Sequence, residues 1–346
     1  MILHRFGNGD VVESCGKALI ARFAGPRRVL STSALNGGIK DSLTSVFNQD
    51  CKEDGEKNVP LKALTYEEHL KIVSADLGLE SQTSTGLTTA ADMENVSIAA
   101  ETYDNVTVTA VVTGGIDVNG GRVGDPADWH ESAGVCAPAP GTINILLFIS
   151  AALPEGTLAR ALVTCTEAKT AALQELLAPS MYSSGIATGS GTDGTIIVSD
   201  LTSPVVLTYA GKHSKLGELI GRAVMKAVKK ALYLQTGLGP AQQFDIFSRL
   251  GRYGVTRAGI LKSCTDGAKL DALSKQSDLV VPTSLYVHLL DQLSWGLIGP
   301  ADAVASASRL LEDMGMKAEI TQYSDAKSAS EAMLSVYVQG LQKMLL

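Results

Sequence analysis

The chain has 346 residues, of which 45% are hydrophobic, 19% are charged and only 5% are aromatic. Its formal net charge of −7 argues against a nucleic-acid partner, and its length favours two domains over a single core. Its five cysteines form no CxxC pair, and we find neither a signal-peptide core nor an apolar run of about 18 residues. We therefore expect a cytoplasmic protein with reduced thiols and no membrane partner.

The first third of the chain is predicted to form short strands and one helix. β-branched or apolar runs bounded by Gly, Pro and Asn predict strands at 18–23, 28–33, 81–89 and 106–113. A polar loop at 49–58 leads to a helix near 66–77. Asn36, Gly37 and Gly38 form a turn at a strand end, where glycine leaves backbone N–H groups free to meet a ligand.

A second glycine-rich loop, at 113–125, contains Asp117, Asn119 and Asp125. The nearly continuous hydrophobic run at 142–150 then predicts a central strand, interrupted by Asn144. A buried amide must find hydrogen-bond partners, and neighbouring backbone is a slightly better candidate than a ligand.

A helix is predicted at 155–177, with one stripe of apolar side chains. Lys169 projects from the middle of that stripe, and Glu167 lies on the opposite side among small residues, so both faces look covered. Buried Lys and Glu are rare unless they are paired or functional. The alternatives are a structural ion pair, or a Lys169 whose ammonium group reaches water along the surface.

Polar groups are most concentrated in the loop 185–194, which combines four glycines with hydroxyl residues and Asp193. Apolar segments at 195–198 and 204–207 predict a short strand pair. Ser214 is a candidate N-cap for a helix through residue 232, which places Lys212 and His213 at the positive helix end. We expect the two loops to form opposite walls of one site, the alternative being a hairpin beside an ordinary helix cap.

At 236–240 the pattern changes from glycine-rich strands to helices, which marks a domain boundary. Helices are predicted at 241–253, 284–297, 300–314 and 328–345, with a possible strand at 318–322. The expected fold is an α+β domain, residues 1–236, whose mixed or antiparallel sheet is covered by helices near 155–177 and 214–235. A smaller, mostly α-helical domain of unassigned role follows, residues 237–346.

Several common sites are excluded by their missing motifs. The sequence has no P-loop, no GxGxxG between a strand and a helix, no HExxH or Cys/His cluster, and no GxSxG. No metal site or nucleotide site is therefore expected. The remaining Asp, Glu, His, Lys and hydroxyl residues favour hydrolysis, either by acid–base chemistry or by a Ser or Thr nucleophile.

The sequence resembles the adenosylcobinamide amidohydrolase family of corrinoid salvage. Motifs typical of that family occur in order at 30–38, 86–91, 112–125, 140–144, 166–173, 188–193 and 209–221. Two departures are Gly-Gly-Ile-Asp-Val-Asn at 114–119, where the family has Ala-Gly and an Asn-Ala pair, and Ser190 in place of a threonine. The resemblance ends near Pro240.

The resemblance implies hydrolysis of the amide that joins aminopropanol to the corrin ring of adenosylcobinamide, giving adenosylcobyric acid for cobalamin synthesis. The corrinoid would be the substrate, and its cobalt would not be a catalytic metal; no other cofactor is expected. The competing interpretation is a corrinoid-binding or carrier protein without turnover, and a regulatory module is a third.

Such a hydrolase needs an activated nucleophile, a stabilised oxyanion and a proton for the leaving amine. Glu167 or Asp193 would activate water, Glu167 being favoured as the more desolvated carboxylate, and His213 or Lys169 would protonate the amine. Backbone N–H groups of residues 189–192 would bind the oxyanion. Ser190 or Thr192 as nucleophile is the alternative. Residues expected to bind substrate are Asn36, Gly37, Gly38, Asn119, Asp125, Asn144, Thr188, Gly189, Ser190, Gly191, Thr192 and Lys212.

Overall fold

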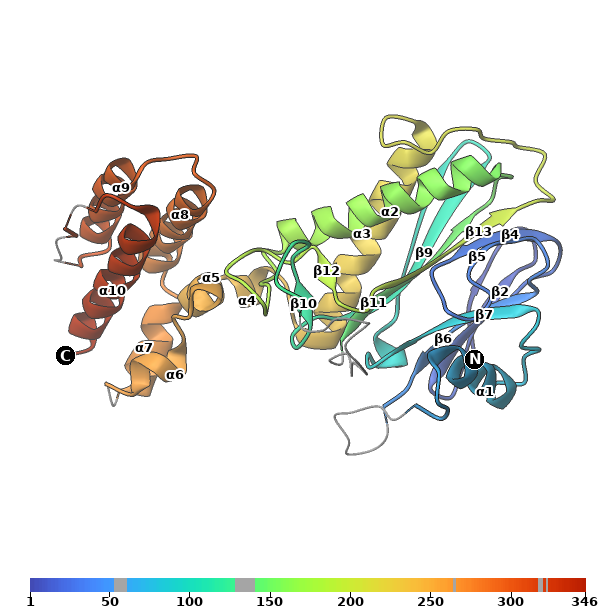
Figure 1. Ribbon diagram of the computed structural model, residues 1–346, viewed down its shortest axis with the longest axis horizontal. Helices are drawn as coiled ribbons and strands as arrows, with labels where there is room; N and C mark the ends of the chain where they lie inside the picture. Colours follow the sequence, from blue (N-terminus) through green and yellow to red (C-terminus); the bar gives the residue numbers. More distant parts are fainter. Residues whose placement is uncertain (53–60, 128–140, 264–265, 317–319, 322) are drawn as a thin grey trace. The chain divides into compact units, whose positions relative to one another are not determined.

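The computed structural model describes residues 1–52, 61–127, 141–263, 266–316, 320–321 and 323–346 (Figure 1). The chain divides into an N-terminal unit, Met1–Tyr182 with Ile186–Leu238, and a helical unit, Gly239–Leu346 with Ser183–Gly185. Among the helices in these ranges, none combines the length and the apolar character needed to span a membrane. Cys15, Cys51 and Cys165 are free thiols.

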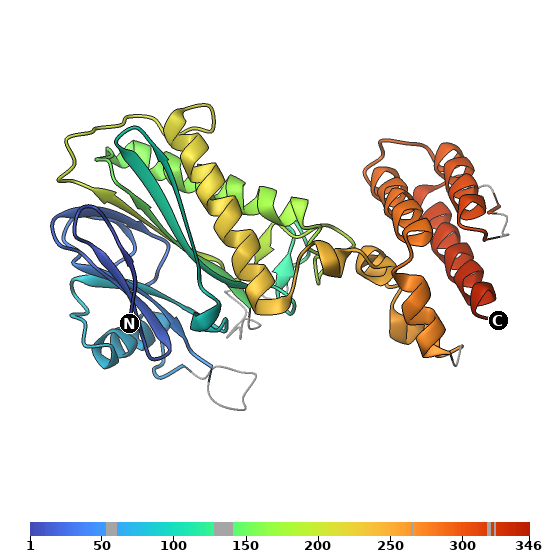
Figure 2. The same cartoon turned by 180° about the vertical axis from the view of Figure 1, so that it is seen from behind.

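The N-terminal unit consists of two stacked sheets between two layers of helices, as the two views in Figures 1 and 2 show. One sheet has the order β5 (Gly38–Lys40), β4 (Arg27–Ser31), β13 (Gly194–Asp200), β11 (Thr142–Ile149), β9 (Val106–Gly115), β8 (Ser97–Tyr103). The other has the order β1 (Ile2–Arg5), β2 (Val11–Cys15), β3 (Ala18–Arg22), β6 (Ser45–Asp50), β7 (Ser84–Thr89). Two short strands, β10 (Gly120–Gly121) and β12 (Gly189–Ser190), pair separately.

The pairs β11–β13 and β6–β7 are parallel, and the other pairs are antiparallel. Helices α2 (Glu155–Glu175) and α3 (Lys215–Thr236) cover the outer face of the six-stranded sheet. Helix α1 (Tyr66–Asp76) covers the outer face of the five-stranded sheet, and η1 (Met93–Asn95) is a single 3-10 turn. The predicted α+β class with mixed sheets is confirmed, as is the central strand at 142–150, whose eight residues in β11 are all buried.

Helix α3 begins as its sequence predicts. The Ser214 hydroxyl accepts a hydrogen bond from the N–H of Gly217 at 3.1 Å, which satisfies one of the free donors of the first turn. A Cβ atom at Gly217 would lie 2.0 Å from the carbonyl oxygen of Gly211, so only glycine allows this close approach of two backbones.

The strands predicted at 18–23 and 28–33 are confirmed as β3 and β4. They belong to different sheets, because the turn between them passes the chain from one layer to the other. One predicted strand pair was wrong. The segment 204–207 forms no strand pair with 195–198. It makes only an isolated bridge between Val206 and Ala152, beyond the C-terminal end of β11.

The loops that carry the motifs at 30–38, 86–91, 112–125 and 188–193 gather at one end of the sheets. This loop end comprises the C-terminal ends of β4, β6, β7 and β9 and the N-terminal ends of β11 and β13. The Ser33 hydroxyl donates to the Gly86 carbonyl at 2.6 Å, and the Asn144 amide donates to the Thr88 carbonyl at 3.0 Å. Segments far apart in the sequence are therefore in direct contact there.

The helical unit has its own apolar core. Its helices are α4 (Pro240–Gln243), α5 (Ile246–Leu250), η3 (Gly251–Tyr253), α6 (Arg257–Leu261), α7 (Gly267–Ser274), α8 (Ser277–Ser294), α9 (Pro300–Asp313) and α10 (Ala326–Leu345). The single helix expected at 241–253 is broken, because the Asp245 carboxylate accepts from the N–H of Phe247 at 2.7 Å and starts a new helix. The strand expected at 318–322 lies largely outside the described residues.

Candidate active site

Lys169 and Asp193 form an ion pair at the loop end. Lys169 comes from the apolar stripe of α2, and Asp193 immediately precedes β13. Both side chains are 12% exposed, so the pair is largely shielded from water. The predicted burial of Lys169 is confirmed, and its charge is compensated by the aspartate rather than carried to the surface.

The Asp193 carboxylate is fully occupied. Its Oδ1 accepts from the N–H of Ile143 at 2.9 Å and from the hydroxyl of Ser190 at 2.7 Å. Its Oδ2 accepts from the N–H of Ser190 at 3.0 Å and also contacts the Lys169 ammonium. A carboxylate offers about four lone-pair positions. Asp193 therefore holds Ser190, Lys169 and the start of β11 in one arrangement, and it has no acceptor position left for a water molecule.

The glycines of this loop make room for the polar groups. A Cβ atom at Gly189 would lie 2.3 Å from Asp193 Oδ2 and 2.7 Å from Lys169 Nζ. At Gly194 it would lie 2.6 Å from Leu87 Cδ2 and 2.8 Å from Asn144 Oδ1. The glycine-rich sequence is thus required because the ion pair and the Asn144 amide pack directly against the backbone.

The expected oxyanion donors are only partly available. The N–H of Ser190 donates to Asp193, and the N–H of Thr192 donates to the Ser190 hydroxyl at 3.3 Å. The Thr192 hydroxyl donates to the Gly141 carbonyl at 2.8 Å, and the Thr188 hydroxyl accepts from the N–H of Val123 at 2.9 Å. These contacts fix the loop conformation and use two of the N–H groups that we expected to face a substrate.

Asn119 and Asp125 hold the second glycine-rich loop in place. The Asn119 amide donates to the Gly141 carbonyl at 3.1 Å and accepts from the Tyr182 hydroxyl at 2.8 Å. Asp125 accepts from the N–H of Arg122 at 2.8 Å and from the Ser180 hydroxyl at 2.6 Å. A Cβ atom at Gly191 would lie 3.2 Å from Asn119 Oδ1, so the two glycine-rich loops are neighbours.

Asn144 lies in a buried polar cluster between the two sheets. Its amide donates to Asn48 Oδ1 at 2.6 Å, and the Asn48 amide donates to the Thr113 hydroxyl at 2.8 Å. All three residues are 1% exposed. Asn144 bonds to neighbouring backbone as expected, at the Thr88 carbonyl, but its side-chain partner Asn48 was not predicted. The missed signal was Asn48, a polar residue two positions after buried Val46 on the same face of the strand.

Asn36 has a left-handed backbone conformation, with φ of 48°. Its amide nitrogen donates to the carbonyls of Ser81 and Ser84, both at 2.7 Å. A Cβ atom at Gly37 would lie 2.2 Å from the Ser33 carbonyl oxygen. The turn Asn36–Gly37–Gly38 is therefore fixed against the start of β7, and the Asn36 amide nitrogen has a structural role there.

Glu167 is not desolvated, contrary to our expectation. It forms a surface ion pair with Lys212 at 3.2 Å, and the two side chains are 43% and 57% exposed. The face of α2 that carries Glu167 was predicted to be covered, but its small residues leave it open to water. His213 is exposed beside Lys212. Lys169 and Glu167 point from different faces of α2. The loop that carries Lys212 and His213 therefore lies on the Glu167 side of this helix, and it does not form the expected site wall opposite Asp193.

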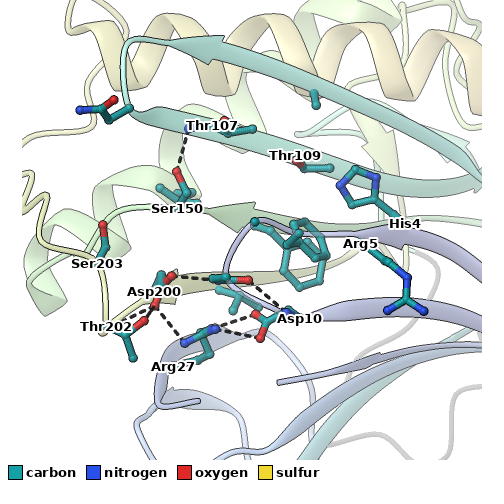
Figure 3. A pocket seen from close by; sticks show the side chains of 18 of the residues that line it. His4, Arg5, Asp10, Arg27, Thr107, Thr109, Ser150, Asp200, Thr202 and Ser203 are labelled. Atoms are coloured by element: carbon teal, nitrogen blue, oxygen red, sulfur yellow. Dashed lines mark hydrogen bonds and ion pairs between the residues drawn. The ribbon is translucent and has the colours of Figure 1, made fainter. Parts of the chain in front are cut away.

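A cavity of about 530 Å³ lies at the other end of the sheets, where β11 and β13 finish (Figure 3). On one side, the buried guanidinium of Arg27 donates to Asp10 at 2.8 Å and to Asp200 at 2.9 Å. Thr107, Thr109 and Ser150 line another side. The charged groups on this side of the cavity pair with one another, and their contacts link the turn before β2 to β4 and β13.

Metal ligands are not grouped in the part of the chain that the structure describes: no three His, Cys, Asp or Glu side chains there could hold an ion. His130, Cys136 and Cys264 fall outside the described ranges, as does Pro140 of the motif at 140–144.

Residues 5–240 match the profile of a family described as adenosylcobinamide amidohydrolase. An uncharacterized protein of Methanocaldococcus jannaschii is 35% identical over 235 residues, which cover 63% of this chain and 87% of the relative. A protein of Methanosarcina mazei named adenosylcobinamide amidohydrolase is 29% identical over 212 residues, which cover 59% of this chain and 90% of that protein. A solved structure, the PH0078 protein of Pyrococcus horikoshii, aligns over 64% of this chain and 82% of its own with 12% identity and a TM-score of 0.31, which is too low to establish a shared fold.

Proposed function

We propose, because this chain belongs to the adenosylcobinamide amidohydrolase family, that it hydrolyses the amide between aminopropanol and the corrin ring of adenosylcobinamide. The products are adenosylcobyric acid, which can re-enter cobalamin synthesis, and aminopropanol. The corrinoid is substrate, and its cobalt takes no part in bond cleavage. A cytoplasmic location is part of this proposal.

The observation that carries the proposal is the shielded contact of Lys169, Asp193 and Ser190 at the loop end. Asp193 fixes the other two side chains. Lys169 presents a cation in a largely dry setting, where electrostatic stabilisation of a developing charge is strongest. Lys169 then supplies the proton that the leaving amine requires, a role for which exposed His213 is less suited.

Two routes of attack are open to this arrangement. Water can attack the amide carbon directly. Alternatively, the Ser190 oxygen attacks, its proton passes to Asp193 Oδ1 along the existing 2.7 Å hydrogen bond, and water later hydrolyses the ester. Thr192 is a weaker nucleophile candidate, because its hydroxyl already donates to the Gly141 carbonyl.

The loops of the loop end supply the proposed corrinoid-binding surface. They present backbone and hydroxyl groups of residues 36–38, 119–125 and 188–192. The amide side chains of a corrin ring offer donors and acceptors that match such groups. Lys212 lies on the Glu167 side of α2, and we leave it out of this surface.

The direct test is to incubate the purified protein with adenosylcobinamide and to follow adenosylcobyric acid and aminopropanol by chromatography and mass spectrometry. We expect turnover by the wild type and its loss in Lys169→Met, with Glu167→Gln as the matched surface control that keeps most activity. Single-turnover quenching detects an ester on Ser190 if the hydroxyl route operates. Tight corrinoid binding without any product would instead support the non-catalytic carrier.

A further inference from the structure

Asp50 is a buried carboxylate at the loop end for which the proposed function has so far given no role. It is the last residue of β6, and side chains alternate between the two faces of a strand. Val46 packs between the sheets, and Asn48 reaches across to Asn144 and Thr113. Asp50 is next on this face, paired in register with Thr89 of β7.

In its contacts with the described residues, the Asp50 carboxylate keeps most of its acceptor positions open. Asp50 is 7% exposed. From these residues it accepts one hydrogen bond, from the N–H of Lys52 at 2.9 Å, and the Lys52 ammonium lies 3.8 Å away. Asp193 at the same end accepts four contacts. Within the part of the chain that the structure describes, Asp50 rather than Asp193 has lone pairs left with which to bind and deprotonate water.

The surroundings of Asp50 favour proton uptake. Burial raises the pKa of this carboxyl, and the Lys52 N–H, the Lys52 ammonium and Lys17 only partly oppose that effect. The negative charge of Asp92 acts in the same direction as burial. A general base is most effective when its pKa lies close to the working pH, so a raised value suits this role.

We propose that Asp50 is the general base that activates the hydrolytic water, an inference that rests on the proposed amidohydrolase function. As the water oxygen attacks the amide carbon, one of its protons passes to Asp50, and the carbonyl oxygen becomes the oxyanion. When the carbon–nitrogen bond breaks, the amine nitrogen takes a proton from Lys169, and the proton held by Asp50 returns to Lys169 through water. The new carboxylic acid then gives its proton to the amine, so the products are a carboxylate and an ammonium group. In the Ser190 route the same water hydrolyses the ester. The step needs no co-reactant other than water.

The test compares Asp50 with Asp92, a matched carboxylate that also contacts the Lys52 ammonium but is half exposed. Steady-state rates with adenosylcobinamide are measured against pH for wild type, Asp50→Asn, Asp50→Ala and Asp92→Asn. We expect Asp50→Asn to lose about 10²–10⁴-fold in kcat with little change in KM, and to lose the acid limb of the pH profile. Added formate should restore part of the activity of Asp50→Ala, and Asp92→Asn should stay within about twofold of wild type.

Thermal unfolding provides a readout that is independent of activity. A carboxyl whose pKa is raised by folding binds its proton more tightly in the native state than in the unfolded state. It therefore destabilises the fold increasingly as pH rises above the pKa of the unfolded state. Asp50→Asn should therefore melt above wild type at pH 7.5, and the difference should vanish below pH 4. A purely structural aspartate would give the opposite sign.

The outcomes are distinguishable. An inactive wild type overturns the proposed function and this inference with it. An active wild type together with an active Asp50→Asn, or with no formate rescue of Asp50→Ala, overturns the inference alone. Lost activity combined with formate rescue and raised stability of Asp50→Asn supports both.

Discussion

Replacing Asp193 by asparagine tests the view that this carboxylate organises the site. The change keeps the shape but turns one oxygen into an NH₂ group and removes the charge. If the NH₂ group takes the Oδ2 position, it faces the N–H of Ser190 and the Lys169 ammonium. If it takes the Oδ1 position, it faces the N–H of Ile143. In either orientation a shielded backbone donor loses its acceptor.

The expected cost follows from the shielding of the pair. Leaving a buried donor unsatisfied costs about 1–3 kcal/mol, and removing one partner of a buried ion pair costs about 3–5 kcal/mol. Since both arise from the same group, we expect a total of about 3–5 kcal/mol rather than their sum. For a unit of this size, such a loss lowers Tm by about 6–20 °C.

Calorimetry of wild type, Asp193→Asn, Lys169→Met and the double variant measures this effect. Lys169→Met should cost less than Asp193→Asn, because Asp193 keeps three hydrogen-bond donors. The cycle should show a coupling of about 0.5–3 kcal/mol between the two residues. An Asp193→Asn protein that melts within about 2 °C of wild type would refute the reasoning.

Three further predictions follow from the same structure. Gly189→Ala should reduce both Tm and turnover, because its Cβ would overlap Asp193 Oδ2. Gly221→Ala in α3 has open space around it and should raise the free energy of unfolding by about 0.5–1 kcal/mol. Equal melting curves for the two variants would contradict this reasoning. A fragment of residues 1–238 should fold and keep its activity, because Leu238 is the last residue in the core of the N-terminal unit. Circular dichroism and the corrinoid assay check this. An insoluble fragment would instead indicate that the two units share a core. Burial acts to raise the pKa of Asp200, but hydrogen bonds from Thr202 and Asn8 outweigh it and hold the value below the usual range, so the stabilisation is present above pH 4 and is lost as pH falls. Asp200→Asn should therefore lose most stability near pH 7 and least near pH 2, as urea titrations at several pH values would show.

Periodicity in the sequence was enough to predict the long elements of the N-terminal unit. The apolar stripe of α2, the Ser214 cap of α3 and the continuous run of β11 are local signals, and the structure has all three. Pairing is not local. No local feature of residues 24–26 distinguishes a hairpin turn from a crossing between sheets, and the buried contacts of Arg27 with Asp10 and Asp200 depend on residues far along the chain.

The site was predictable to the extent that its residues lie in polar loops. Lys169 and Asp193 were chosen as buried-stripe and glycine-loop residues. The structure brings their side chains together, and their catalytic roles stay predictions. Glu167 was chosen on the assumption that small neighbours mean a covered face, but a face of small residues stays open unless another element packs on it. Asn48 and Asp50 were missed because a polar residue at an inward strand position resembles an ordinary strand end until its partner strand is known.

The arrangement of the two sheets has a consequence for synthesis of the chain. The five-stranded sheet is complete at Thr89, but its apolar inner face is covered by strands that end only at Asp200. At about 5–20 residues per second, a ribosome needs roughly 6–22 s to make the intervening chain. During that time the inner face of a nascent chain, including the uncompensated Asn48 amide, is exposed to water and to other chains. Slow or stalled translation between β7 and β13 should therefore increase aggregation more than a pause within the helical unit, where each helix packs on near neighbours in the sequence.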